Sequence, residues 1–285
     1  MNKWAVMNGI FLVDKPHGVT SHDVVYQIRK KFNIKKVGHT GTLDPFATGL
    51  MIILIGKATK LAFLFDELDK RYTGTIELGK AYDTDDITGQ VLNDAPVHID
   101  KLVLSKAINQ IKPVYEQVPP TYSAIKKGGI KAYEAARKGQ PLTLSSKTVS
   151  IYQFDYQIKE QSILFETHVS KGTYIRSIAR DLGLLLNTFG ALSVLRRTMI
   201  GRYALKDAKP VEMLDTKDLI DHKLLFQGVK TLVLNDYLVK LVKNGVALDD
   251  RQTNFNEPFI VTDQTGQYIA YYVPHDNQYK VKYFF

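Results

Sequence analysis

The stretch GHTGTLDPFATGL, residues 38–50, combines one carboxylate with donor-rich and turn-forming residues. Asp44 follows glycines and threonines, precedes Pro45 and leads into the apolar run LMIILI at 50–55, while His39 stands five residues upstream. An Asp-Pro pair near glycine is often turn chemistry alone. A rigid strand directly after a turn is also how a protein fixes a reactive carboxylate on a stable scaffold. Both interpretations remain open from these residues.

Other residue types that could carry chemistry are missing or unsuitably spaced. The chain has no cysteine, which excludes disulfides, thiolate zinc sites and cysteine nucleophiles. IGKATK at 55–60 lacks the glycine spacing of a phosphate-binding loop. DTDD at 83–86 lacks the spacing of a calcium loop, which favours a solvated turn. The histidines are too scattered for a metal-binding helix: His17, His22, His39, His98, His168, His222 and His275. We therefore expect no metal.

The elements around Asp44 can be predicted from their patterns. GIFLVDKP at 9–16 indicates a buried strand that ends at Pro16. TSHDVVYQIRKKF at 20–32 indicates a helix capped by Thr20 or Ser21. Its apolar residues share one helical face: Val24, Val25, Ile28 and Phe32. LMIILI indicates a continuous apolar strand.

Strands dominate the rest of the chain up to about residue 228. Strands are expected at 71–79, 147–157 and 162–170, and another in ALSVLRRTMIGRYAL at 191–205. Helices are expected at 99–111 and from Thr173, where the residues of the core face are Ile175, Ile178, Ala179 and Leu182. Because helices and strands do not alternate strictly, the fold class is α+β with a mixed or antiparallel sheet.

The pattern of predicted elements changes near residue 228. TLVLNDYLVKLVKNGVAL at 231–248 resembles one helix that ends at Gly245. Short strands follow in PFIVTD, QYIAYYV and YKVKYFF, with DQTG at 263–266 as a hairpin turn. We expect a domain over 1–228 and a small β-rich domain over 229–285.

Length and composition limit the class of protein. A chain of 285 residues with 45% hydrophobic and 24% charged residues can build a packed core. Its formal net charge of +9 fits a polyanionic partner or an ordinary solvated surface. The first sixteen residues lack the apolar core of a signal peptide, and LMIILI is too short to cross a bilayer. A cytoplasmic, monomeric protein is the expectation.

The stretch around Asp44 resembles the catalytic motif of TruB-type pseudouridine synthases, bacterial enzymes that convert uridine 55 in the T-arm of tRNA to pseudouridine. Further matching stretches occur in the order that this family requires: LVDKPHGVTSHDVV, KRYTGTIELG, VPPTYSAIKKGGIKAYEAARKG, GTYIRSIARDLG and LRR. Together they span about residues 10–200. The resemblance implies the pseudouridine synthase catalytic fold.

The resemblance also implies catalytic roles for matching positions. Asp44 would be the nucleophile, which attacks either the uracil ring or the anomeric carbon of the ribose. Arg176 would face Asp44 and favour its charged form; without such a partner, its place off the apolar stripe predicts an exposed side chain. Tyr72 would stack on the target uracil and assist proton removal from carbon 5. The reaction is an isomerisation, so no cofactor is expected.

The remaining implied roles concern RNA binding. His39 would help to extrude the target nucleotide, Leu195 would pack against the uracil, and Lys15 with Pro16 would brace the active-site loop. An insertion at about 123–142 would clamp the T-arm through its cationic side chains, including Lys126, Lys127 and Lys131. The domain at 229–285 resembles a PUA-like RNA-binding domain. No membrane and no protein partner are implied.

Two alternatives stay open at this point. An RNA-guided relative would share the aspartate motif but work inside a ribonucleoprotein; the insertion at 123–142 and the short C-terminal domain favour the stand-alone type. A non-catalytic module that binds or folds tRNA would fit the positive charge and the aromatic strands equally well. The joint presence of Asp44, Tyr72 and Arg176 favours an enzyme, since RNA binding alone does not require that set.

Overall fold

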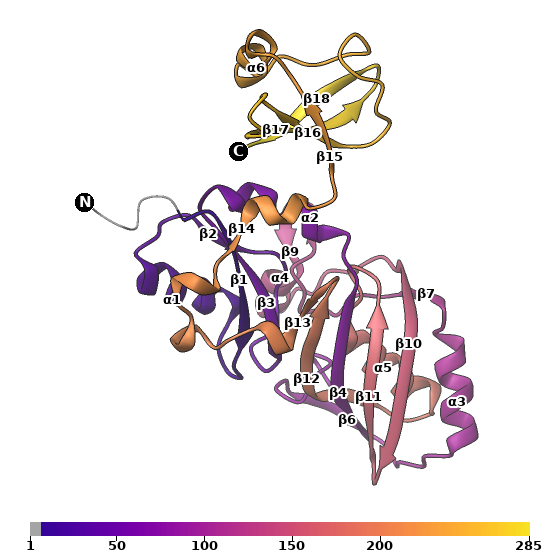
Figure 1. Cartoon of the computed structure of the whole chain (residues 1–285). Helices are drawn as coiled ribbons and strands as arrows, with labels where there is room; N and C mark the ends of the chain where they lie inside the picture. The colour runs from indigo at the N-terminus through magenta and orange to yellow at the C-terminus, as the bar shows by residue number, and fades with distance from the viewer. Residues whose placement is uncertain (1–6) are drawn as a thin grey trace.

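A large mixed β-sheet forms the centre of the protein in the computed structural model, which describes residues 7–285 (Figure 1). Eight strands follow the order β14-β1-β3-β12-β4-β11-β10-β7, with β2 beside β3 and β13 beside β12. The pair β12 and β3 is parallel, while the other neighbours in this sheet are antiparallel. The strands are β1 (Gly9–Lys15), β2 (Val37–His39), β3 (Thr48–Ile55), β4 (Lys70–Leu78), β7 (Val114–Gln117), β10 (Lys147–Lys159), β11 (Ser162–Val169), β12 (Gly190–Ile200), β13 (Tyr203–Ala204) and β14 (Ile220–Asp221). The predicted α+β class with a mixed sheet is confirmed.

Three helices cover one face of this sheet: α1 (Ser21–Phe32), α3 (Lys101–Gln110) and α5 (Ile175–Leu185). Their apolar stripes join the main core, to which α1 contributes Ile28, α3 contributes Leu104 and α5 contributes Leu182. A second cluster, with Phe65 of α2 (Phe63–Asp66), covers the opposite face of β1 and β3. Both faces of these two strands are therefore buried, which explains the unbroken apolar run at 50–55.

The start of α1 follows the sequence prediction. The Thr20 hydroxyl accepts a hydrogen bond from the Asp23 amide at 3.0 Å, and the Asp23 carboxylate accepts one from the Thr20 amide at 2.8 Å. This capping box satisfies two backbone donors at the helix start. It orients the helix that carries Ser21, a residue that contacts the Asp44 loop.

The C-terminal residues form a separate four-stranded sheet of β15 (Lys230–Val233), β16 (Phe259–Thr262), β17 (Tyr268–His275) and β18 (Gln278–Phe284). The three predicted strands and their DQTG turn are confirmed. The single helix expected over 231–245 is wrong in its first part. Residues 230–233 pair in parallel with β16, and α6 (Asp236–Lys243) begins only after Asn235, which caps it. Strand pairing here outweighs helical periodicity.

Small elements connect these layers. The β5 (Lys80–Tyr82) and β6 (Val91–Asp94) strands form one hairpin, and β8 (Lys126–Lys127) and β9 (Ile130–Lys131) form another. The second hairpin and α4 (Ala132–Arg137) occupy the segment predicted as an RNA-clamping insertion. In residues 7–285, none of the helices has the length and apolar character needed to cross a membrane.

A mainly aromatic cluster packs the C-terminal sheet against two short 3-10 helices, η1 (Gly56–Leu61) and η5 (His222–Phe226). Phe226 packs against Tyr271 and Tyr283 of the C-terminal sheet, and Ala58 and Leu61 belong to the same cluster. His222 lies beside Tyr283, is 6% exposed, and its Nδ1 is 3.1 Å from the backbone oxygen of Asn8. Burial lowers the pKa of His222 below its ordinary value.

The buried imidazole of His222 predicts loss of stability in acid. Because the pKa of His222 is lowered in the folded state, the unfolded chain binds the proton more readily, so stability present at neutral pH is lost as the pH falls through the folded pKa. We expect the free energy of unfolding to fall more steeply between about pH 7 and pH 5 in the natural protein than in His222→Phe. Urea titrations measure this difference. If the exposed control His275→Gln reduced the pH dependence of the free energy of unfolding equally, the assignment of this dependence to His222 would be contradicted.

Candidate active site

The loop that carries Asp44 lies between β2 and β3 and is tied to the start of α1. The Ser21 hydroxyl accepts a hydrogen bond from the Leu43 amide at 2.8 Å and donates one to the Leu43 carbonyl at 3.0 Å. The Ala47 amide closes the turn by donating to the Asp44 carbonyl at 3.1 Å. The backbone on both sides of Asp44 is thus fixed before any substrate arrives.

Lys15 lies beneath this loop. Its ammonium is fully buried and donates to the carbonyls of Val19 at 2.7 Å, Pro16 at 3.0 Å and Pro45 at 3.2 Å. Burial lowers the pKa of Lys15 to about 8, with Asp44 acting in the opposite direction. The position agrees with the bracing role. It rules out direct contact of Lys15 with RNA, because a fully buried ammonium has no surface for it.

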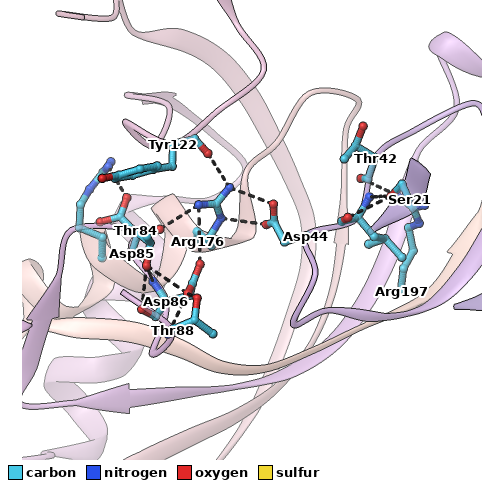
Figure 2. Close-up of polar contacts among 12 residues, drawn as sticks. Ser21, Thr42, Asp44, Thr84, Asp85, Asp86, Thr88, Tyr122, Arg176 and Arg197 are labelled. Carbon is cyan, nitrogen blue, oxygen red and sulfur yellow. Dashed lines mark hydrogen bonds and ion pairs between the residues drawn. The ribbon is translucent and has the colours of Figure 1, made fainter. Parts of the chain in front are cut away.

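A second buried cation, Arg197 on β12, supports the other side of the loop (Figure 2). Its guanidinium donates to the carbonyls of Leu50 at 2.8 Å, Gly41 at 3.1 Å and Thr42 at 3.5 Å. The sequence predicts a role only for the leucine of the LRR motif. Successive side chains of a strand point to opposite faces, so the adjacent arginines already indicated that one of them faces the interior.

Arg176 holds the Asp44 carboxylate with two nitrogens. Its Nε is 2.9 Å from Asp44 Oδ2, and its Nη2 is 3.2 Å from Asp44 Oδ1. The same guanidinium donates to the carbonyls of Thr84 at 2.9 Å and Tyr122 at 3.0 Å (Figure 2). The Arg176 side chain is 7% exposed and that of Asp44 is 34% exposed, so the carboxylate faces the cleft and the arginine lies behind it. The alternative interpretation, in which Arg176 is exposed and has no partner, is therefore wrong.

The charge state of Asp44 depends on this partner. Burial raises the pKa of Asp44, Arg176 opposes that shift, and the nearby carboxylate of Asp86 adds to it. A paired guanidinium favours the ionised carboxylate. Loss of Arg176 would therefore raise the pKa of Asp44 further, because burial and Asp86 would act on it with far less opposition.

The DTDD turn is part of the same network, which the sequence analysis missed. Asp86 is 3% exposed, accepts hydrogen bonds from the amide and hydroxyl of Thr88, and lies 3.7 Å from Arg176 Nη1. Asp85 pairs with Arg180 at 3.0 Å, and burial raises the pKa of Asp85 to about 6. The expected solvated turn is wrong because two arginines of α5 draw these carboxylates inward.

The first helical turn of α5 also departs from the sequence prediction. Its N-cap is Tyr174, whose side chain makes no capping hydrogen bond, and the helix begins at Ile175 instead of the expected Thr173. Thr173 instead donates from its hydroxyl to the Ser170 carbonyl at 3.0 Å. The Tyr174 amide donates to the side chain of Gln117 at 2.7 Å.

A cleft of about 340 Å³ opens over Asp44 and collects several of the predicted residues. Tyr72 of β4 and Leu195 of β12 line it together with Asp44 and Arg176, although these residues are far apart in the sequence. The other lining residues are Thr40, Gly41, Thr42, Leu43, Lys70, Tyr122, Ser123, Ala124, Gly172, Thr173, Tyr174, Ile175 and Arg197. Lys70, whose pKa is lowered by burial, adds a cation that the sequence analysis did not select.

The remaining predicted residues lie outside the cleft lining. His39 ends β2 and is partly buried, and burial together with Arg197 lowers its pKa. Lys126 and Lys127 are exposed on the β8–β9 hairpin, while Lys131 pairs with Glu134 at 3.3 Å. Tyr122, Ser123 and Ala124, at the base of this insertion, do reach the cleft.

A metal site does not emerge from the described residues. Within residues 7–285, no group of three or more histidine or acidic side chains is arranged to hold a metal ion. The acidic groups nearest Asp44 are engaged instead with arginines, as in the pair of Arg176 with Asp86. The ionisable groups of the cleft lining are one carboxylate, three phenols and three cations.

Comparison of the fold with solved structures defines its class. The crystal structure of a Cbf5-Nop10-Gar1 complex matches with a TM-score of 0.66 at 21% identity and covers 93% of this chain and 78% of that one. The structure of an H/ACA RNP bound to a substrate RNA containing 2′-deoxyuridine matches with a TM-score of 0.67 at 19% identity, covering 96% and 83%. These matches extend over both sheets. The predicted pseudouridine synthase fold with a PUA-like C-terminal unit is confirmed.

Sequence comparison defines the family. The model of the TruB family pseudouridylate synthase N-terminal domain matches residues 29–175. The tRNA pseudouridine synthase B of Acholeplasma laidlawii (strain PG-8A) is 71% identical over 98% of this chain and all of the relative. That of Onion yellows phytoplasma (strain OY-M) is 50% identical over 98% and 100%. This chain belongs to the TruB family of pseudouridylate synthases, and it is an enzyme.

The two-nitrogen contact predicts that Arg176 cannot be replaced by lysine. Arg176→Lys keeps one positive charge but loses the planar fork that reaches both oxygens of Asp44 and the two backbone carbonyls. We expect the turnover number to fall by about 100-fold or more, because small displacements of reacting groups cost that much. Steady-state kinetics on a folded variant measure it.

Arg196→Lys is the matched control for Arg176→Lys. Arg196 pairs with Asp14 at 2.7 Å and does not line the cleft. This substitution should leave turnover within about 2-fold of the natural protein, because the charge is kept and a partly exposed ion pair of this kind contributes little. Near-normal turnover of Arg176→Lys would show that the two-nitrogen contact of the guanidinium is not needed for catalysis.

Proposed function

We propose that this enzyme converts uridine 55 in the T-arm of tRNA to pseudouridine, with Asp44 as the nucleophile. Full-length relatives at 71% and 50% identity are named tRNA pseudouridine synthase B, which supports tRNA as the substrate. The observation that carries the proposal is the Asp44 carboxylate, held by Arg176 at the floor of a cleft that Tyr72 and Leu195 also line. The enzyme acts as a single chain, without a cofactor or protein partner.

The proposed reaction rearranges bonds without an external reagent. The Asp44 carboxylate bonds to carbon 6 of the uracil or to carbon 1′ of the ribose, and the glycosidic bond to N1 breaks. The uracil rotates, carbon 5 bonds to carbon 1′, and the hydrogen of carbon 5 leaves as a proton while N1 gains one. Asp44 departs unchanged. A carboxylate suits this chemistry because it forms a covalent adduct and later leaves, as in glycosidases.

The neighbours of Asp44 support the other proposed catalytic roles. Tyr72 lines the cleft and carries both an aromatic ring and a hydroxyl, the groups needed to stack on the uracil and to take part in proton removal from carbon 5. Leu195 of the neighbouring strand offers the base an apolar contact. His39, beside the Asp44 loop, takes part in extruding the nucleotide, whose unstacking costs a few kcal/mol that new contacts must offset.

The RNA is held outside the cleft by charge. We assign catalysis to residues 1–228 and a supporting RNA contact to residues 229–285. The hairpin of β8 and β9 carries exposed Lys126 and Lys127, with Lys131 at its end. Cationic loops of this kind contact phosphates without reading bases. The residues that attach the hairpin reach the cleft, so a T-arm bound there would place a uridine near Asp44.

The alternatives make different predictions for bare RNA. An RNA-guided enzyme would need partner proteins, whereas the relatives named tRNA pseudouridine synthase B align along their whole length with this single chain. A binding module would need no charged pair in its cleft. The Arg176–Asp44 pair has a cost of burial that binding alone does not require.

Release of tritium from carbon 5 tests the proposal. A T-arm stem-loop labelled with tritium at carbon 5 of its uridines should lose the label to water when treated with the natural protein at low salt. Asp44→Asn should bind the same RNA and release none, because an amide is not a nucleophile for this step. Release without added metal, guide or partner is the expected result.

A control RNA and a binding assay complete this experiment. A stem-loop in which uridine 55 is replaced by cytidine is the matched control and should release no tritium from the remaining uridines. Binding without release by the natural protein would favour the guided enzyme or the binding module. Equal release by Asp44→Asn would exclude Asp44 as the nucleophile.

The exposed lysines of the hairpin predict a salt effect that is separate from chemistry. Replacing Lys126 and Lys127 by alanine should raise the Kd for tRNA and leave the turnover number at saturating RNA unchanged, because both side chains lie outside the cleft lining. The slope of log Kd against log salt should fall by about one for each lost phosphate contact. Filter binding over a range of salt measures it. Replacing Lys101 and Lys106 of α3 makes the same charge change, and an equal loss of slope in that control would count against the hairpin as the clamp.

A further inference from the structure

Gln117, the last residue of β7, is a buried amide with its polar atoms fully engaged. The residue is 1% exposed. Its Oε1 accepts a hydrogen bond from the Tyr174 amide at 2.7 Å, and its Nε2 donates to the Tyr174 carbonyl at 3.1 Å. Nε2 also donates to the hydroxyl of Tyr115. One side chain therefore binds both backbone groups of one residue.

That residue stands directly before α5. Tyr174 is the N-cap of α5, and its own side chain makes no capping hydrogen bond. The first amides of a helix have no partner within the helix and must find one elsewhere. Gln117 supplies such a partner for one of them, the Tyr174 amide, from a strand 57 residues away in the sequence.

Arg176 follows Tyr174 by two residues in the sequence. Arg176 reaches Asp44 with both its Nε and its Nη2. Farther along α5, Ser177 and Arg180 donate to the Val118 carbonyl at 2.9 Å and 2.8 Å. The segment directly after Gln117 is thus held to the same two helical turns that carry Arg176.

We propose that Gln117 is a positioning residue for catalysis, because its two hydrogen bonds to the Tyr174 backbone set the start of α5 so that Arg176 meets Asp44 with both nitrogens. This inference rests on the proposed role of Asp44 as nucleophile. Gln117 does not line the cleft, so it acts through Tyr174 and Arg176 and not on the substrate.

A purely structural role for Gln117 predicts a different outcome. If the amide only joins β7 to α5, its loss would lower the melting temperature while the folded molecules kept the Asp44–Arg176 pair. If Gln117 positions Arg176, its loss would also change the ionisation of Asp44. The groups that act on this carboxylate are Arg176, Asp86 and Lys15, so a displaced guanidinium leaves burial and Asp86 less opposed.

Gln117→Met tests the proposal. Methionine has a similar length but neither accepts from the Tyr174 amide nor donates to its carbonyl. The aspartate carboxyls are labelled with ¹³C, and the Asp44 signal is identified by its absence in Asp44→Asn. NMR titration should then give a higher pKa for Asp44 in Gln117→Met than in the natural protein. Single-turnover tritium release at saturating stem-loop should fall by about 10-fold or more, whereas the Kd for RNA should change by less than about 3-fold.

The control separates positioning from general destabilisation. Ile163→Val removes one buried methyl from β11, in the same sheet and away from the cleft. It should lower the melting temperature and leave both the Asp44 titration and the single-turnover rate unchanged. An Asp44 titration that is the same in Gln117→Met and the natural protein would overturn the proposal. Inactivity of the natural protein on the stem-loop would overturn the proposed function instead, while the titration would still decide the role of Gln117.

Discussion

The ion pair between Arg176 and Asp44 is the interaction on which the rest of the site depends. A carboxylate at the floor of a cleft loses hydration, and burial raises its pKa unless a cation opposes the shift. The fold supplies that cation from α5, a helix far from the Asp44 loop in the sequence, and keeps the arginine behind the carboxylate. The exposed oxygen surface of Asp44 then faces the space where Tyr72 and Leu195 also lie.

Two further cations hold the Asp44 loop without neutralising Asp44 by direct contact. The ammonium of Lys15 and the guanidinium of Arg197 donate to backbone carbonyls on either side of it, those of Pro45 and Gly41 among them. Buried cations need partners, and loop carbonyls need donors, so each satisfies the other. This arrangement gives rigidity to a loop that, as an ordinary turn, would be mobile.

The positions of Arg176 and of the insertion proposed to bind RNA are linked through one short segment. Gln117 binds the backbone at the start of α5, and the Tyr122 carbonyl accepts a hydrogen bond from Arg176 itself. The same segment continues into the hairpin that carries Lys126 and Lys127. In the proposed complex, contacts with phosphates at the hairpin and contacts with the base in the cleft would therefore involve the same wall of the site.

The sequence by itself determined the α+β class, α1 with its cap and the apolar β3 strand, because these depend on local periodicity. Its unusual motifs also predicted that Asp44, Tyr72 and Arg176 share one site, and all three line the same cleft. The sequence did not determine the buried roles of Lys15, Arg197, Asp86 and Gln117, nor the β15 strand within an apparent helix. Each of these depends on a partner supplied by a distant segment: carbonyls of the Asp44 loop, the guanidinium of Arg176, the backbone of Tyr174 and the edge of β16. A charged or amide side chain has the same sequence signature whether it is solvated or paired, so only the tertiary structure could decide between the two.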